Sequence, residues 1–412
     1  MPYRTGVFRI GLALVGWQVL TAMACGQPQD VKVSRPTRLD WEFAASGFDH
    51  DPAADVPADY DSKKQKYQLY VPVRYTTTKA WPLIVFISPA AGPVGWTSVQ
   101  RTCEKEGILF CSPYKAGNSI SAGLRIRIIL DMVDDVRRNF RIDPHQTYIG
   151  GFSGGGRMSC SIGFALPEVF AGVIPVCGTN PPKSLPYLRH RLVDRVSVAL
   201  ITGEGDFNRS ENEQWMAPYL KELDIRSQLW VVPGMGHDIP HANIMSEVVA
   251  WLAADLKRRQ EDAKARPNLN LKFDEAFRGD AQAERLLAAA RGELHDDQRL
   301  WQGFAMAQGL MKRWPESAAA ATSRELLNEV FGNEARAEIL ARQRLADDSQ
   351  SFTAQARGQE RIGKIPKAIE IWEALARKHP NSPIAESARA EVLRLQDQKR
   401  PPKVERKKRG TK

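Results

Sequence analysis

The stretch that decides the fold is TYIGGFSGGG, residues 147–156. Four residues typical of a buried strand lead into a Gly-x-Ser-x-Gly pattern at 151–155, and a helical segment begins at Gly156. Average residue usage would produce this pattern by chance in roughly one chain in ten of this length, so the pattern alone is weak evidence. Its position between a strand and a helix makes it informative. On a strand-to-helix turn a serine stands exposed, and the flanking glycines let strand and helix approach closely. The stretch therefore predicts a nucleophilic Ser153.

Short apolar strands and amphipathic helices alternate on both sides of this stretch, from about residue 66 to residue 256. The predicted strands cover residues 67–73, 83–87, 108–111, 147–150, 173–176, 198–201 and 229–232. Apolar residues at helical spacing from Ile126 to Phe140 predict a helix whose charged residues face solvent, namely Arg125, Arg127, Asp131, Asp134 and Arg138. The alternation predicts an α/β fold, a mainly parallel sheet with helices on both faces.

Two turns further along the chain carry groups that would activate a serine. Strand 196–202 leads into Gly-Glu-Gly-Asp at 203–206, and strand 228–232 leads into Pro-Gly-Met-Gly-His at 233–237. A serine nucleophile needs a base and an acid that orients the base. We predict His237 as the base, whereas His241 is expected to start the next helix. Asp206 is the predicted acid, because a few residues are needed before a carboxylate can reach back, and Glu204 is the alternative.

Hydrogen-bond donors are also needed for the charge that develops on a carbonyl oxygen during attack. One predicted donor is the backbone N–H of Gly154, at a helix N-terminus whose dipole favours an anion. The other should come from the loop Ser-Pro-Ala-Ala-Gly at residues 88–92. Pro89 has no N–H, so Ala90 or Ala91 is the candidate.

The elbow at 148–156, the turn at 203–206 and Gly236-His237 together resemble the α/β-hydrolase superfamily. Residues 67–237 are most similar to its branch of polyhydroxybutyrate-depolymerase-like and feruloyl or acetylxylan-type esterases. The resemblance implies a triad of Ser153, Asp206 and His237 and an acyl-enzyme on Ser153. It also implies cleavage of small-molecule or polymer-linked carboxylic esters. The family usually places His-Gly after the third strand, where this chain has Ser88-Pro89, so we expect a differently built oxyanion hole.

Two other functions share this sequence pattern. A peptidase on the same fold would use the same acyl-enzyme chemistry. A catalytically silent hydrolase fold could act as a binding module beside the helical region, although three triad candidates in the right order argue against it. No cofactor motif and no metal-ligand spacing of Cys or His is present, so we expect neither a cofactor nor a structural metal.

Beyond residue 256 a charged segment, 257–267, is predicted to link the α/β domain, 40–260, to an all-α helical-repeat domain, 268–396. The segment Pro315-Glu-Ser-Ala-Ala-Ala returns 65 residues later as Pro380-Asn-Ser-Pro-Ile-Ala. The last helical pair resembles a tetratricopeptide repeat, which would offer a surface for a partner protein. A cut near Pro267 should leave ester hydrolysis intact, because no catalytic candidate lies beyond it.

The two ends of the 412-residue chain are predicted to lie outside the fold. Residues 1–24 match a signal peptide, so we expect export to the periplasm, cell envelope or extracellular space. Cleavage after Ala24 would make Cys25 the first residue, which could then carry a lipid anchor. This anchor is the only membrane attachment that we expect. The other cysteines, Cys103, Cys111, Cys160 and Cys177, could form two disulfides or stay free. The chain has a net charge of +10, and residues 399–412 alone hold eight Lys/Arg and one Glu. Most of the charge therefore lies in the basic tail, 397–412, which we expect to be a disordered end. Because the rest of the chain is nearly neutral, we expect no nucleic-acid partner.

Overall fold

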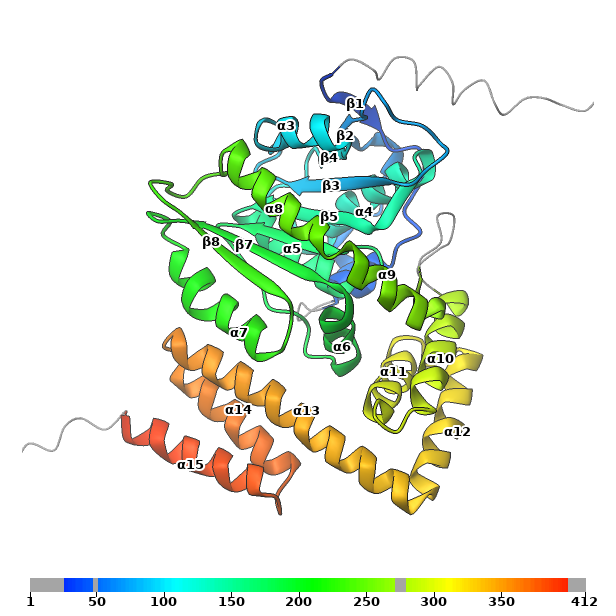
Figure 1. Ribbon diagram of the computed structural model, residues 1–412, viewed down its shortest axis with the longest axis vertical. Helices are drawn as coiled ribbons and strands as arrows, with labels where there is room; N and C mark the ends of the chain where they lie inside the picture. The colour runs from blue at the N-terminus through cyan, green and yellow to red at the C-terminus, as the bar shows by residue number, and fades with distance from the viewer. Residues whose placement is uncertain (1–25, 47–50, 271–278, 399–412) are drawn as a thin grey trace, which may run out of the picture. The chain divides into compact units, whose positions relative to one another are not determined.

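The computed structural model describes residues 26–46, 51–270 and 279–398 (Figure 1). The predicted signal peptide, Cys25 and the basic tail from residue 399 on lie outside these residues. The chain separates into two compact units, Met1–Ala337 and Glu338–Lys412. Within the described ranges, no helix combines the length and the apolar character needed to span a bilayer.

The first unit is built on one eight-stranded sheet in the order β1-β2-β4-β3-β5-β6-β7-β8. Strands β1 and β2 pair antiparallel to their neighbours, and the other six are parallel to one another. The strands are β1 Gln29–Lys32, β2 Lys66–Tyr70, β3 Trp81–Ile87, β4 Leu109–Pro113, β5 Ile142–Phe152, β6 Gly172–Val176, β7 Ser197–Gly203 and β8 Ser227–Val232. The predicted α/β class and mainly parallel sheet are confirmed, and β1 is an additional strand.

Helices cover both faces of this sheet because its strands are apolar on both sides. The helices are α2 Trp41–Ala45, α3 Trp96–Glu106, α4 Ala122–Asn139, α5 Gly154–Ala165, α6 Pro186–Arg195, α7 Ala217–Glu222, α8 Ala242–Ala254, α9 Leu256–Ala265, α10 Asp280–Leu294, α11 Leu300–Arg313, α12 Ala318–Gly332, α13 Glu334–Arg361, α14 Ile365–Lys378 and α15 Pro383–Gln398. Short helical turns lie at Pro52–Asp55, Ser62–Lys64, Glu211–Met216 and Pro267–Leu269. Figure 1 shows the sheet between α8 and α5. Apolar residues of α3 and α8 pack on Tyr148 and Ile174, whereas α5 approaches their neighbours Ile149 and Val173.

The charged face predicted for helix α4 does not face solvent, which corrects the sequence interpretation. Asp131 and Asp134 are fully buried, and Arg125 is 4% exposed. The segment before α2 covers this face: the backbone N–H of Thr37 donates to Asp131 (2.7 Å) and Arg38 pairs with Asp134 (2.9 Å). A helical wheel cannot reveal this arrangement, because the covering segment lies about 90 residues away in the sequence.

The predicted charged linker after residue 256 is instead helix α9, and its charges are mostly engaged. Arg259 is completely buried and donates to the carbonyl of Leu252 (2.8 Å). Arg258 donates to the carbonyls of Val193 and Asp194 at the end of α6, at 3.1 and 2.7 Å. These arginines satisfy backbone oxygens that a helix end leaves without partners.

Helices α10–α12 pack on the α/β part of the same unit. Gly309 of α11 lies against the ring of Tyr187 on α6, where an added Cβ would come within 2.5 Å of that ring. Arg313 of α11 donates to Asp40 at 2.6 Å. Arg266, just after α9, pairs with Glu293 of α10 at 2.7 Å. The domain limits proposed from the sequence stay predictions, but within Met1–Ala337 these helices and the sheet form one compact body.

The internal repeat has a shared local structure, seen within each unit separately. Ser317 and Ser382 each accept a hydrogen bond from the N–H three residues on, at 3.2 and 3.3 Å. Arg324 and Arg389 each donate to the carbonyl nine residues back, at 3.3 and 3.1 Å. In the second unit, α14 and α15 enclose an apolar core that includes Trp372 and Leu395. The helical C-terminal region is confirmed, and its tetratricopeptide-like character stays a prediction.

All four described cysteines are free and buried. Burial raises the pKa of the Cys103 and Cys111 thiols well above its usual value. The structure therefore has free thiols, one of the two alternatives that the cysteine count left open.

Candidate active site

Ser153 stands on a strained turn between β5 and α5. Its backbone lies at φ 54° and ψ −118°, a conformation that residues with a side chain rarely adopt. The turn is tight enough to exclude side chains beside it: a Cβ on Gly155 would overlap the carbonyl oxygen of Ile87. A Cβ on Gly151 would come within 2.5 Å of the Gly155 carbonyl carbon. The two glycines of the motif are thus required by the close approach of β3, β5 and α5.

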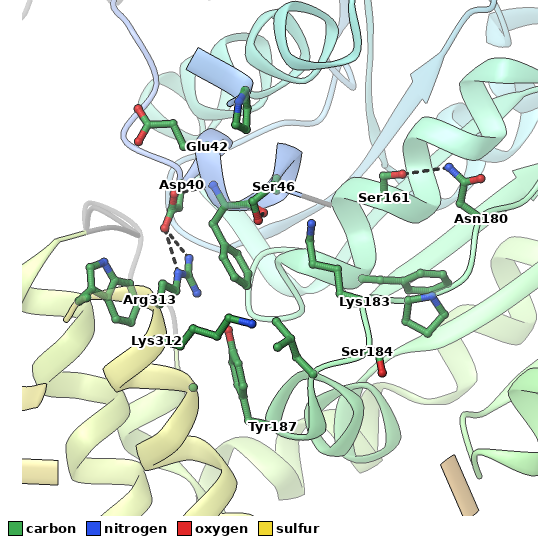
Figure 2. A pocket seen from close by; sticks show the side chains of 18 of the residues that line it. Asp40, Glu42, Ser46, Ser161, Asn180, Lys183, Ser184, Tyr187, Lys312 and Arg313 are labelled. Atoms are coloured by element: carbon green, nitrogen blue, oxygen red, sulfur yellow. Dashed lines mark hydrogen bonds and ion pairs between the residues drawn. The ribbon is translucent and has the colours of Figure 1, made fainter. Parts of the chain in front are cut away.

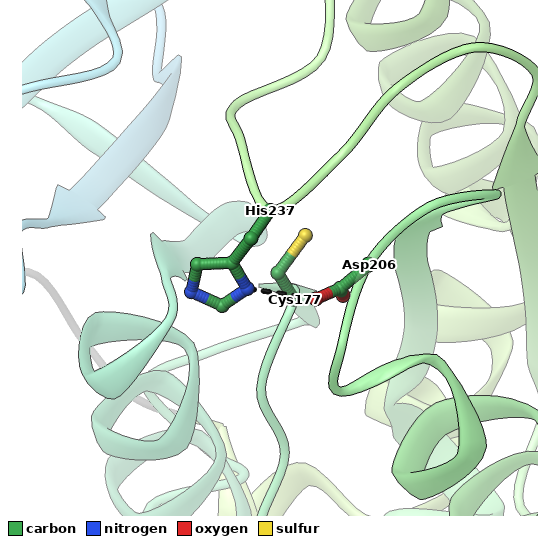
Figure 3. A group of neighbouring side chains, drawn as sticks. All are labelled: Cys177, Asp206 and His237. Atoms are coloured by element: carbon green, nitrogen blue, oxygen red, sulfur yellow. Dashed lines mark hydrogen bonds and ion pairs between the residues drawn. The ribbon is translucent and has the colours of Figure 1, made fainter.

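The structure brings the three predicted triad residues together. His237 Nε2 lies 2.9 Å from Ser153 Oγ, and His237 Nδ1 lies 2.7 Å from Asp206 Oδ1. Figure 3 shows the imidazole of His237 reaching from the loop after β8 toward Asp206, in the loop after β7. The Asp206 side chain is fully buried and that of His237 is 18% exposed. Each group therefore lies at the carboxyl end of its strand, on one edge of the sheet.

Asp206 is held ionised by its surroundings. Burial would raise the pKa of its carboxyl, but hydrogen bonds from the Asn208 N–H, Thr202 and His237 outweigh it and keep the pKa below its usual value. Thr202 Oγ1 donates to Oδ2 at 2.7 Å, and the Asn208 N–H donates to Oδ1 at 2.9 Å. The carboxylate can thus orient the imidazole and stabilise a positive charge on it.

The alternative acid does not reach the histidine. Glu204 Oε2 accepts a hydrogen bond from the N–H of Gly234 at 3.0 Å, and thereby braces the loop that carries His237. His241 is the N-cap residue of α8, as predicted. Of the two acidic residues in the 203–206 turn, only Asp206 bonds to His237 in the structure.

The candidate oxyanion donors lie near the elbow with different hydrogen-bonding states. Gly154 is the first residue of α5, so its N–H has no partner within the helix. The N–H of Ala90 donates to Ser88 Oγ at 3.0 Å. No hydrogen bond from the N–H of Ala91 is found within the described part of the chain, and its carbonyl accepts from Lys115 at 2.6 Å. Ala91 is therefore the freer of the two loop candidates.

Two residues beside the triad have no signal in the sequence. Phe207 is 75% exposed, and its ring stacks on His237 with centroids 4.0 Å apart. Cys177 is buried beside Asp206, with a φ of 55°. Phe207 directly follows Asp206 in the sequence, whereas only the folded arrangement of the β6 and β7 loops brings Cys177 to the triad.

Cys177, Asp206 and His237 offer three potential metal ligands within 4.8 Å (Figure 3). The arrangement suits a triad better than a metal centre. Burial, together with a hydrogen bond to Asp206, raises the pKa of the Cys177 thiol to about 12, whereas a metal needs the thiolate. Asp206 Oδ1 and His237 Nδ1 are also already hydrogen-bonded to each other.

A cavity of about 1080 Å³ lies elsewhere in the same unit and contains no triad residue. Figure 2 shows Lys183, Lys312 and Tyr187 directed into it, beside the ion pair of Asp40 and Arg313. Burial and the nearby Arg313 lower the pKa of the Lys183 ammonium to about 8. The cavity is therefore separate from the chemistry at Ser153.

Comparisons with known proteins match the part of the chain that carries these residues. Residues 122–254, which include Ser153, Asp206 and His237, match the family model described as Phospholipase/Carboxylesterase. Poly(3-hydroxyalkanoate) depolymerase C from Paucimonas lemoignei is 40% identical over 50 residues, which is 12% of this chain and 12% of the depolymerase.

Solved hydrolase structures are similar to part of this chain. S-formylglutathione hydrolase from Staphylococcus aureus is 16% identical with a TM-score of 0.38, covering 46% of this chain and 92% of its own. Est1E from Butyrivibrio proteoclasticus is 15% identical with a TM-score of 0.37, covering 48% and 97%. The two sequence matches support an esterase-like α/β-hydrolase, so the predicted resemblance is confirmed.

Proposed function

We propose that this α/β-hydrolase is a serine esterase that cleaves carboxylic esters through an acyl-enzyme on Ser153. The observation that carries the proposal is the hydrogen-bonded series Asp206–His237–Ser153, at 2.7 and 2.9 Å, on a strained elbow. A decayed site would be expected to lose one member or its geometry. We therefore favour an enzyme over a silent binding module.

In the proposed reaction, Ser153 Oγ attacks the ester carbonyl carbon while His237 Nε2 takes its proton. The carbonyl electron pair moves to oxygen, next to the N–H of Gly154, and returns as the bond to the alcohol oxygen breaks. The leaving alcohol takes the proton from His237. Water then attacks the acyl-enzyme in the same way, which releases the acid and restores Ser153.

Labelling with a fluorophosphonate tests the nucleophile directly. We expect the wild-type protein to gain one adduct by intact mass, and Ser153→Ala to gain none. Ser119→Ala, which changes an exposed serine in the loop before α4, is the matched control and should label like the wild type. A folded wild-type protein that takes no label would contradict the esterase proposal.

Rates on paired substrates test the reaction type. Hydrolysis of p-nitrophenyl acetate with no cleavage of p-nitroanilide peptides would support the esterase, and the reverse would favour a peptidase. Acetyl, feruloyl and polyester substrates then define the natural class of small-molecule or polymer-linked ester.

Export and attachment of a lipid at Cys25 are part of the same proposal, resting on the sequence of residues 1–25. The intact mass of protein isolated from its host would show a chain beginning at Cys25 and carrying acyl groups. A mass that includes residues 1–24 would contradict export by a cleaved signal.

A further inference from the structure

Asn118, in the loop before α4, lies directly against the elbow. Its backbone N–H donates to the carbonyl of Pro89 at 2.8 Å, which ties this loop to the one that carries Ala90 and Ala91. Its carboxamide packs on Gly154, since a Cβ there would overlap Oδ1 and lie 2.6 Å from Nδ2. Asn118 therefore contacts the residue whose N–H is the first candidate donor to the substrate oxygen.

Arg125 fixes which end of the Asn118 carboxamide is the donor. Its Nη1 donates to Asn118 Oδ1 at 2.8 Å, so Oδ1 is the acceptor and Nδ2 carries the two N–H groups. Among the described residues, Nδ2 has no hydrogen-bond partner, and the Asn118 residue is exposed. A free N–H donor thus lies beside Gly154, on an exposed residue.

The same arginine holds the neighbouring loops in place. Its Nη2 donates to the carbonyl of Ser88 at 2.9 Å, and its Nε donates to that of Ala116 at 2.5 Å. All three acceptors of Arg125 are neutral oxygens, so no carboxylate neutralises the guanidinium through these bonds. Burial lowers the pKa of Arg125 to about 10, which leaves it protonated at neutral pH. Its charge therefore favours negative charge developing nearby.

We propose that Asn118 Nδ2 donates a hydrogen bond to the carbonyl oxygen of the substrate in the tetrahedral transition state, together with the N–H of Gly154. Arg125 is a positioning residue that acts through the Asn118 carboxamide and the Ser88 loop. This inference rests on the proposed esterase function. A donor on Asn118 would replace one that the 88–92 loop lacks, since Pro89 has no N–H and the N–H of Ala90 is already bonded to Ser88 Oγ.

Asn118→Ala tests the donor. We expect kcat for p-nitrophenyl acetate to fall about 10- to 100-fold with KM within about threefold, since the bond forms in the transition state. Affinity for a boronic acid that forms a tetrahedral adduct with Ser153 should fall by a similar factor. Asn118→Asp keeps an acceptor for Arg125 but lacks the N–H groups, so it should lose at least as much activity. Ser119→Ala should behave like the wild type, and an unchanged kcat in Asn118→Ala would overturn the proposal.

A double-mutant comparison tests Arg125 as a positioning residue. We expect Arg125→Gln to lower kcat with little change in KM, and Asn118→Ala to cost much less in that background than in the wild type. Independent, multiplying losses would overturn the coupling. A melting temperature for each variant separates these effects from loss of folding. If the wild type itself neither labels with fluorophosphonate nor turns over esters, the proposed function fails and Asn118 is not the cause.

Discussion

Phe207 places an exposed apolar ring beside the imidazole that would act as base. Its ring is 75% exposed and lies 4.0 Å from that of His237, so a bound acyl or alcohol group would contact it. We predict that Phe207→Ala raises KM for apolar esters about 3- to 10-fold, which matches the loss of roughly 1 kcal/mol of apolar contact. Phe331→Ala, which removes another exposed ring far along the same unit, should leave KM unchanged. An unchanged KM in Phe207→Ala would show that substrates bind elsewhere on the triad's rim.

The positive charge of Lys183 is disfavoured by the groups around it. Burial, aided by Arg313, lowers its pKa to about 8, below the roughly 10.4 of an unfolded lysine. Below pH 8 Lys183 is charged in both the folded and the unfolded chain, and its burial destabilises the folded state fully. This destabilisation falls as pH rises from about 8 and is gone above about 10.4. We predict that Lys183→Met raises the melting temperature at pH 7 and that this gain shrinks by pH 10. Lys312→Met, at an exposed lysine of the same cavity, is the matched control, and a gain in Lys183→Met that does not depend on pH would contradict the prediction.

The elbow depends on how closely α5 approaches β3. Gly155→Ala would drive a methyl group into the carbonyl of Ile87, which belongs to the central sheet and cannot move freely. We predict a loss of several degrees in melting temperature and loss of turnover. Gly292→Ala on α10 meets nothing within 4 Å and should instead be neutral or slightly stabilising, because alanine favours helix. Similar melting curves for the two variants would refute the steric argument.

The elements near the elbow could be predicted from the sequence because local rules govern them. Parallel strands are short apolar runs, and Ser153, Asp206 and His237 follow three of them: the buried ends of β5 and β7, and the half-exposed edge strand β8. The polar face of α4 could not be predicted, since its partners Thr37 and Arg38 lie far away in the sequence. Charged residues are normally predicted to face solvent, and this rule fails for α4 and also for α9, where Arg259 is buried. Asn118 was missed for the same reason: its role depends on a contact with Gly154 that only the tertiary structure creates.

The contacts of α10–α12 change where the chain can be shortened. A cut near Pro267, which the sequence suggested, removes Glu293 from Arg266 and Arg313 from Asp40. It also uncovers the ring of Tyr187 that packs on Gly309. We predict that a chain ending at Arg266 melts several degrees lower than one ending at Ala337. The latter should keep wild-type turnover, and equal melting temperatures would show that the helices add no stability.

The segment that covers α4 is held by contacts that do not depend on an unbroken backbone after it. Residues 33–41 are fixed by contacts with distant parts of the chain: Ser34 bonds to Asp135, Thr37 to Asp131 and Asp40 to Arg313. The stretch that follows, around Ala53 and Ala54, is largely exposed. A protease nick there would leave the N-terminal piece docked, and the two fragments should copurify under native conditions. The molecule is thus suited to be divided and reassembled at this point, as a split reporter is.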